Sequence, residues 1–209
     1  MAAAYRLSVI QEAEAEPLII HLRPGLQMTE DQFFEFCQVN DDLQIERTAR
    51  GEILVMAPTG GEGSYREVEA ATILRIWANK DGRGRAFGST AGFRLPNSAV
   101  RAPDASWVRL DRLAKLTPRQ KRKFLPLCPD FVIEILSVSD RLEKLQGKMA
   151  EYRENGACLG WLIDPEKRKV YIYRPGKRVQ CLNHPKRVSG DPELPGFELE
   201  MAEIWKPPF

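Results

Sequence analysis

The feature that most constrains the fold is a short, almost wholly apolar run over residues 131–136, with the letters FVIEIL. Its length and its β-branched residues are typical of a central β-strand with both faces covered. A helix is predicted next over residues 140–155, with Asp140 as its N-cap and Gly156 placed to end it. A hairpin is predicted over residues 161–173. A buried strand between such elements predicts a sheet that helices cover.

The chain before this run supplies further helices and strands. The predicted elements are a helix over Met28–Val39 capped by Thr29, a strand pair over Leu43–Arg47 and Glu52–Met56, a glycine-rich segment over Pro58–Ser64, a helix over 65–80, and two strands over Ala86–Leu95 and Ala99–Leu110. This order predicts an α/β or α+β fold, a mixed β-sheet flanked by helices. We expect residues 1–27 to be an N-terminal extension and residues 28–209 to form a single domain.

Two carboxylates occupy positions that an ordinary core would not favour. Glu134 lies inside the apolar run, and Asp104 interrupts the predicted strand Ala99–Leu110. An unpaired buried carboxylate is costly, and a cation, a metal ion or a shifted pKa is its usual remedy. The alternative is a salt bridge on an edge strand, which for Asp104 could involve Arg101 or Arg109. Glu134 has no basic residue within its run, which favours a functional role.

A lysine on the following helix is expected to reach Glu134. The strand from Glu134 to its end near Ser137 is about 10 Å long at the usual strand rise. The helix from Asp140 to Lys148 is about 12 Å long at the helical rise. A helix that folds back over its own strand therefore brings Lys148 to the level of Glu134, and Lys144, one turn earlier, is the alternative. Two acids and one lysine suit metal-assisted cleavage of a phosphodiester bond.

Five segments carry a resemblance to a known family: PTGGEGS, STAGFRLPN, VRAPDASWVRLDR, LCPDFVIEILSVSDRLEKLQGKMAEYRENGACLGWLIDPEKRKVYIYRPG and LPGFELEMAEIW. They resemble the Uma-type family of bacterial putative restriction endonucleases, which is placed in the PD-(D/E)XK nuclease-like superfamily. The resemblance implies a sheet-centred nuclease fold. It places the aspartate of the PD motif at Asp104, the strand glutamate at Glu134 and the helical lysine at Lys148. The chain departs from the superfamily at Leu136, where the lysine usually stands.

The resemblance also implies a cofactor and its ligands. The cofactor is Mg²⁺ or Mn²⁺, and the metal ligands fall on Asp104, Glu134 and Ile135. Nuclease-like sites of this superfamily often add a further acid from the glycine-rich loop or the helix after it. Glu62 and Glu69 are equal candidates for that acid, and each could instead be a plain surface charge.

A basic segment connects the two strands that carry the carboxylates. It contains six basic residues and no acid: Arg112, Lys115, Arg119, Lys121, Arg122 and Lys123. Because it joins those strands, we expect it to lie near the site and, with Lys144, to contact DNA phosphates. The alternative is a solvated, mobile loop.

Composition narrows the partners and the location. The formal net charge is +2, so the overall charge does not demand a nucleic-acid partner. Four cysteines without metal-finger spacing and only two histidines make a zinc site improbable. No apolar run is long enough to span a bilayer, and we expect a cytoplasmic protein. Similar nucleases suggest a homodimer. The predicted function is Mg²⁺-dependent DNA cleavage, and the alternative is a catalytically weak module that binds DNA or a protein.

Overall fold

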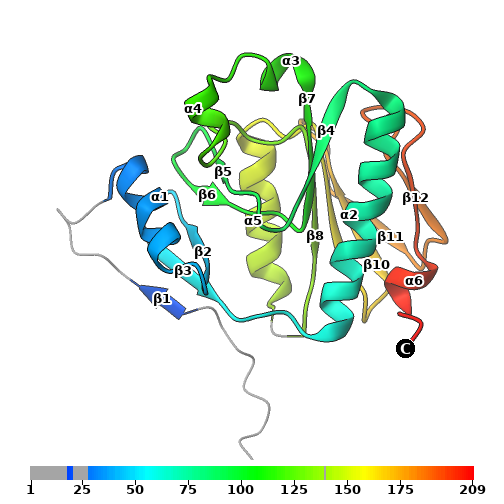
Figure 1. Cartoon of the computed structure of the whole chain (residues 1–209). Helices are drawn as coiled ribbons and strands as arrows, with labels where there is room; N and C mark the ends of the chain where they lie inside the picture. The colour runs from blue at the N-terminus through cyan, green and yellow to red at the C-terminus, as the bar shows by residue number, and fades with distance from the viewer. Residues whose placement is uncertain (1–17, 21–27, 139) are drawn as a thin grey trace, which may run out of the picture.

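The computed structural model describes residues 18–20, 28–138 and 140–209, so most of the predicted extension over 1–27 lies outside the described residues. The described chain forms three sheets with helices packed around them (Figure 1). A small sheet has the strand order β1-β3-β2-β6-β5, the main sheet has the order β11-β10-β9-β8-β7-β4, and β12 pairs with β13. The predicted mixed α+β class is confirmed.

The elements follow one another along the chain in this order: β1 (Leu18–Ile20), α1 (Glu30–Val39), β2 (Gln44–Arg47), β3 (Ile53–Met56), α2 (Gly61–Asp81), β4 (Gly84–Gly88), β5 (Phe93–Arg94), β6 (Val100–Arg101), β7 (Ala105–Arg109), α3 (Leu110–Leu113), α4 (Pro118–Lys121), β8 (Phe131–Ile135), α5 (Leu142–Glu154), β9 (Leu159–Asp164), β10 (Lys169–Tyr173), β11 (Gln180–Asn183), β12 (Arg187–Ser189), β13 (Glu198–Glu200) and α6 (Ala202–Trp205).

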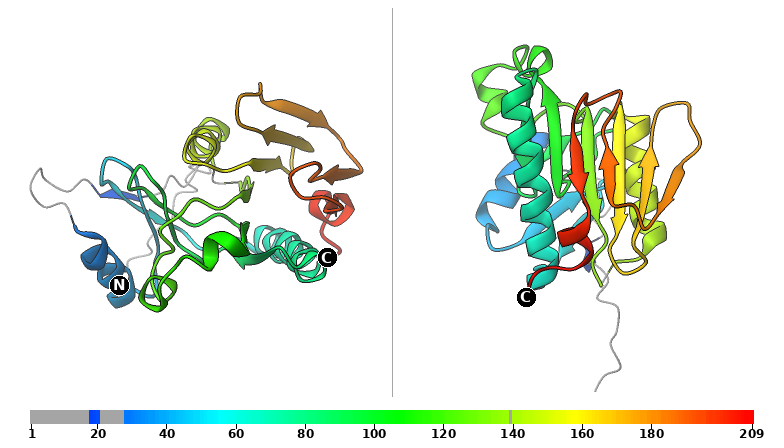
Figure 2. Two further views of the ribbon diagram at one scale, coloured as in Figure 1. Left: turned by 90° about the horizontal axis from the view of Figure 1, so that it is seen from above. Right: turned by 90° about the vertical axis from the view of Figure 1, so that its right-hand side faces the viewer.

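The strand predicted from the apolar run lies inside the main sheet. All five residues of β8 are buried, and β8 pairs antiparallel with β7 and parallel with β9. The helix α5 makes the crossover between the two parallel strands, as such connections require. The long helix α2 lies on the other face of the sheet from α5 (Figure 2). Both faces of β8 are therefore covered, which explains its continuous apolar sequence.

Alternation along β8 decides where its glutamate points. Phe131, Ile133 and Ile135 pack in the core cluster that contains residues of α2. Val132 packs instead in the cluster that contains Met149 of α5. Successive side chains of a strand point to opposite faces, so Glu134 shares the face of Val132 and points toward α5.

The small sheet and its helix follow the predicted local signals. Strands β2 and β3 pair antiparallel, and Thr29 caps α1 with a complete capping box. Phe33 of α1 is fully buried against Ile53 and Val100 on one face of this sheet. The predicted helix and strand pair are confirmed.

Other boundaries were predicted wrongly. The helix α2 begins at Gly61, so half of the glycine-rich segment is helical, and Gly82, with φ 76°, ends the helix in the left-handed conformation that glycine favours. The two predicted strands over 86–95 and 99–110 are four short strands that belong to two different sheets.

The predicted cap of α5 was also wrong. Asp140 accepts hydrogen bonds from the backbone and the hydroxyl of Ser137, and α5 begins at Leu142 without a side-chain cap. No helix in the described parts of the chain is long and apolar enough to cross a membrane.

Candidate active site

An ammonium group held between two buried carboxylates forms the centre of the candidate site. Lys148 Nζ lies 2.8 Å from Glu134 Oε1 and 2.9 Å from Glu46 Oε1. It also donates a hydrogen bond of 3.0 Å to Glu134 Oε2. Glu46 and Glu134 are 2% and 4% exposed, so both acids are nearly removed from water. Such burial of charge is tolerated only where partners are close.

The position of Lys148 follows from chain geometry. Glu134 and Lys148 are 14 residues apart, and α5 runs back over β8 from the sheet end that β8 has reached. The helical residues traversed therefore return the lysine to the level of the glutamate, as the lengths of the two elements predicted. Both Glu46 and Glu134 form an ion pair with Lys148, while Lys144 lies exposed one turn earlier.

Glu46 reaches the site from the small sheet, and the sequence analysis missed it. It accepts hydrogen bonds of 2.9 Å from Arg101 Nη1 and from the backbone nitrogen of Ala102. Arg101 Nε in turn lies 2.6 Å from Glu151 Oε2. The short polar strand β2 contains no apolar run against which a glutamate stands out, so no local signal marks Glu46. Arg101, considered above as a partner of Asp104, is committed to these two glutamates.

Tyr152 of α5 is a further hydrogen-bond partner of Glu134. Its fully buried hydroxyl donates a hydrogen bond of 3.0 Å to Glu134 Oε1. The ring of Tyr152 also lies 5.9 Å from the Lys148 ammonium, within the range of a cation–π contact. Tyr152 and Met149 are the buried residues of α5, and the Tyr152 hydroxyl joins this buried face of the helix to the site.

Asp104 lies beside Glu134 at the end of the main sheet. It precedes β7 rather than interrupting a strand, one step beyond the paired residues Ala105 and Ile133. Its Oδ2 accepts a hydrogen bond of 2.6 Å from the backbone nitrogen of Ile135. The structure thus brings together the side chains of Asp104, Glu134 and Lys148 and the main chain of Ile135.

Burial and neighbouring charge move the pKa values of the acids in different directions. Burial, followed by the charges of Glu134 and Glu67, raises the pKa of Asp104 well above 3.8. Burial also raises the pKa of Glu134, although Lys148 opposes it. For Glu46, Lys148 and Arg101 together outweigh burial and lower the pKa. Burial and nearby negative charge thus favour the neutral form of Asp104 and Glu134, whereas Lys148 and Arg101 favour the ionised form of Glu46.

The further acid near Asp104 is Glu67, not either of the two candidates from the sequence. Glu67 of α2 acts on the pKa of Asp104. Glu62 lies 2.7 Å from Arg66 in an exposed ion pair, and Glu69 faces the charge of Glu203. A signal for Glu67 was present, because it precedes the buried Ala70 and Leu74 of α2 by three and seven residues and so lies on the same helical stripe.

The basic segment does not lie near the site, and that expectation was wrong. It leaves the far end of β7, whereas Asp104 precedes the start of that strand. The five residues of β7 separate the two ends by about 17 Å. Arg112 pairs with Asp130, while Arg119 and Lys123 both pair with Asp31 of α1. The remaining members, Lys115, Lys121 and Arg122, are exposed.

The donor set fits a hard divalent cation that keeps part of its water shell. In the described ranges no three or more side chains of His, Cys, Asp and Glu are placed to hold a metal ion by themselves. Two carboxylates and a main-chain oxygen are nonetheless a common complement for Mg²⁺, with waters completing the shell. The raised pKa of Asp104 fits this chemistry, because added positive charge would relieve the repulsion from Glu134 and Glu67.

Replacement of Asp104 by asparagine should stabilise the metal-free protein at neutral pH. The unfolded-state pKa is near 3.8 and the folded-state pKa is higher, so wild-type stability falls as pH rises between the two values. The expected loss is about 1.4 kcal/mol per pH unit in that window. Urea unfolding in the presence of a chelator should give Asp104→Asn a larger free energy of unfolding than the wild type at pH 7. Below about pH 4 the two values should be equal. A variant that is less stable at both pH values would contradict the repulsion.

Comparison with known proteins supports the fold and identifies a family. The family model described as "Putative restriction endonuclease", Uma2, matches residues 30–202. A crystal structure of a putative nuclease belonging to DUF820 from Anabaena variabilis superposes with a TM-score of 0.71 at 22% identity, covering 85% of this chain and 97% of that one. At this identity the likeness shows the fold. No curated protein matches the chain significantly.

Proposed function

Because this chain belongs to the Uma2 family of putative restriction endonucleases, we propose that it hydrolyses phosphodiester bonds in DNA with Mg²⁺ or Mn²⁺. The observation that carries the proposal is the cluster at the end of β8, where Lys148 lies 2.8 Å from Glu134 and Asp104 adjoins them. We also propose that residues 28–209 form a single domain, that the protein is cytoplasmic, and that it acts as a monomer or a homodimer.

In this proposal Asp104, Glu134 and the main-chain oxygen of Ile135 hold the cation. A bound divalent cation neutralises charge on the scissile phosphate and lowers the pKa of a coordinated water. Asp104 is positioned for this role by its hydrogen bond from the Ile135 nitrogen, which leaves its other oxygen available. Glu67 would bind through water or orient one.

Lys148 is the group that acts on the phosphate. Burial would lower its pKa, but Glu134 and Glu46 raise the pKa above 10.5, so the amine stays protonated at neutral pH. It therefore donates hydrogen bonds and positive charge, which stabilise the charge that develops on the phosphate oxygens. It does not accept a proton. Glu46, fixed by Arg101, is the second carboxylate that positions the ammonium.

One observation favours the alternative, a nuclease-fold module that binds DNA without efficient cleavage. Both oxygens of Glu134 are occupied, one by Lys148 and Tyr152 and the other by Lys148. A cation could bind there only if it displaced at least one of these donors, which would lower its affinity. The presence of Leu136 where the superfamily usually has lysine points the same way.

Metal binding separates the two functions. Titration calorimetry of the wild type with Mn²⁺ and with Mg²⁺ should show saturable binding near neutral pH, and Glu134→Gln should weaken that binding by about tenfold or more. In parallel, a supercoiled plasmid should be nicked or cut only when the metal is present and not in a chelator. Saturable DNA binding without cleavage under any divalent metal would decide for the binding module.

A further inference from the structure

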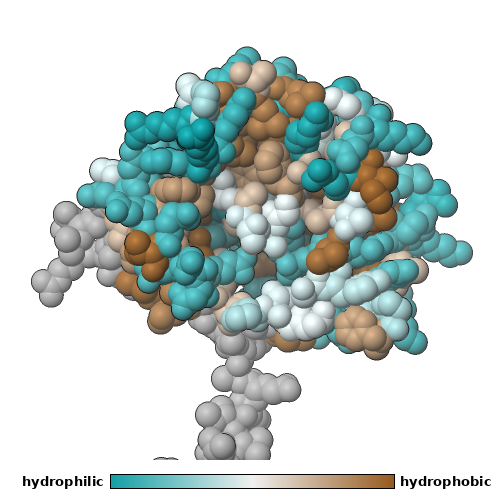
Figure 3. Space-filling view, in the orientation of Figure 1, coloured by the Kyte–Doolittle hydropathy of each residue, from teal (hydrophilic) through white to brown (hydrophobic). Residues whose placement is uncertain are grey.

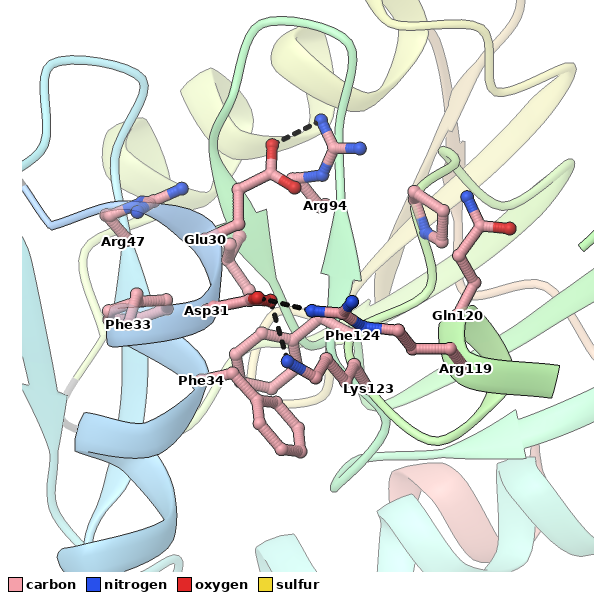
Figure 4. A pocket seen from close by; sticks show the side chains of 12 residues that line it. Glu30, Asp31, Phe33, Phe34, Arg47, Arg94, Arg119, Gln120, Lys123 and Phe124 are labelled. Atoms are coloured by element: carbon pink, nitrogen blue, oxygen red, sulfur yellow. Dashed lines mark hydrogen bonds and ion pairs between the residues drawn. The ribbon is translucent and has the colours of Figure 1, made fainter. Parts of the chain in front are cut away.

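A pocket lies across the small sheet from the candidate active site. Its volume is about 170 Å³, and residues of α1, β2, β5, β6 and the segment around α4 line it (Figure 4). Neighbouring residues of two strands divide between the two sites. Glu46 pairs with both Lys148 and Arg101 on one side, whereas Arg47 and Val100, next to Glu46 and Arg101 in the strands, line the pocket. Because side chains alternate between faces, the pocket is separate from the cluster.

The pocket is the size of one aromatic ring and has aromatic walls. A cavity of about 150 Å³ is known to accommodate benzene. Phe34 and Phe124 meet edge to face with their ring centroids 5.1 Å apart, and both are only half-buried. Phe33 is fully buried behind them and carries the Arg47 guanidinium 4.8 Å above its ring. Phe33 is thus a structural wall. Phe34 and Phe124 are the half-buried rings that a ligand can contact, and Lys123 Nζ lies 5.5 Å from the centroid of the Phe34 ring.

Four cations surround these rings, and two carboxylates of α1 pair with three of them. Asp31 lies 2.6 Å from both Arg119 and Lys123, and Glu30 lies 2.8 Å from Arg94 (Figure 4). Arg47 is the fourth cation, so four cations and two carboxylates give the lining a formal charge of +2. The Asp31 side chain is 58% exposed, so its pairs are weak and open easily. A phosphate group forms stronger charge-assisted hydrogen bonds with the same cations.

We propose that this pocket binds one unpaired nucleotide of a nucleic-acid strand, with the base against Phe34 and Phe124 and a phosphate on Arg119 and Lys123 in place of Asp31. This inference rests on the proposed function and names the part of the substrate held outside the cleavage site. The exposed Lys121 and Arg122 extend the basic surface beyond the pocket, where hydrophilic side chains gather over α4 (Figure 3). In the free protein the Asp31 carboxylate occupies the phosphate position and pairs with Arg119 and Lys123.

The sign of one substitution separates this role from a structural one. If Asp31 only tethers α1 to the basic segment, its loss weakens DNA binding or leaves it unchanged. If it occupies the phosphate position, Asp31→Asn frees two cations and tightens binding. Glu35→Gln removes the same charge from the same helix, and Glu35 is exposed and lies outside the pocket lining, so it is the matched control.

The experiment measures fluorescence anisotropy of a labelled single-stranded oligothymidylate with the full chain in a chelator, at several salt concentrations. Asp31→Asn should tighten binding about threefold to tenfold, and Glu35→Gln should change it much less. Lys123→Gln should weaken binding and lower the salt slope by about 1. Phe34→Ala should weaken binding about tenfold without changing the slope, because base stacking does not depend on salt. Thermal unfolding of each variant checks that it is folded.

Several outcomes would overturn the inference. The first three are equal affinities for Asp31→Asn and Glu35→Gln, unchanged affinity in Phe34→Ala, and no binding of the oligothymidylate. The fourth is displacement of the oligothymidylate by free thymidine monophosphate at the same nucleotide concentration, which would indicate a site for a mononucleotide rather than for a strand. If the pocket variants still cleave DNA and bind the oligothymidylate as the wild type does, this inference is wrong and the proposed function stands. If the affinities change as expected but no metal-dependent cleavage is seen, the pocket inference stands and the proposed function is wrong.

Discussion

Replacing Glu134 by glutamine should abolish metal-dependent cleavage of DNA while the protein stays folded. The substitution keeps the shape of the side chain and an acceptor for the Tyr152 hydroxyl, which now lies 3.0 Å from Glu134 Oε1. It removes one of the two negative charges proposed to hold the cation. Loss of a residue that hydrogen-bonds to a metal ligand already lowers metal affinity or activity by about 10- to 100-fold. A direct ligand should cost at least about a hundredfold in the initial rate of plasmid nicking.

A buried carboxylate outside the site provides the control. Asp130 is 5% exposed and pairs with Arg112 at the other end of the same strand pair. Asp130→Asn should lower stability and leave the nicking rate per folded molecule close to that of the wild type. Asp104→Asn should behave as Glu134→Gln does. Cleavage that survives both site substitutions would come from another site or another protein, and the proposed active site would be wrong.

Replacing Lys148 by methionine should produce a large loss of stability. The ammonium is the shared partner of Glu46 and Glu134, and its side chain is only 15% exposed. Methionine fills similar volume, but it leaves two buried carboxylates facing each other. Removing one partner of a buried ion pair costs about 3–5 kcal/mol. Urea unfolding at pH 7 should therefore show a decrease of this size in the free energy of unfolding.

The pH dependence of this loss tests its cause. In the wild type Lys148 has its pKa raised, so its stabilising contribution is complete below about pH 10.5 and disappears as the pH rises through the folded-state value. In the variant Glu134 loses the cation that offsets its burial, whereas Glu46 keeps its ion pair with Arg101, so protonation of Glu134 is what relieves the loss. The difference from the wild type should therefore shrink as the pH falls toward 4.5, the ordinary pKa of glutamate, and Glu134 becomes protonated.

Two matched variants complete this test. Lys144 lies exposed one turn earlier on α5, and Lys144→Met should change stability by about 0.5 kcal/mol or less, as surface substitutions usually do. Combining Lys148→Met with Glu134→Gln should recover part of the loss, because the carboxylate that Lys148→Met leaves without its cation is gone. An equal loss in Lys144→Met, or a deficit that persists unchanged at low pH, would show that helix packing rather than buried charge is responsible.

The sequence by itself determined the part of the site whose members are close in the chain. The apolar run of β8 predicts a buried strand, its lone acid marks Glu134, and the rise per residue of a strand and a helix places Lys148 beside it. These two residues are 14 apart, and one crossover helix connects them. Local geometry is sufficient over such a distance, because few conformations of a strand, turn and helix return the chain to the same sheet.

Only the tertiary structure decided the members that come from other sheets and helices. Glu46 and Arg101 are 55 residues apart and meet because β2 pairs antiparallel with β6 in the small sheet. The charge of Glu67 acts on the pKa of Asp104 because α2 packs against β7. The antiparallel pairing of β7 with β8 places the basic segment at the far end of the sheet. Periodicity reports which face a side chain occupies. It does not report which distant segment covers that face, since this depends on the packing of the whole chain.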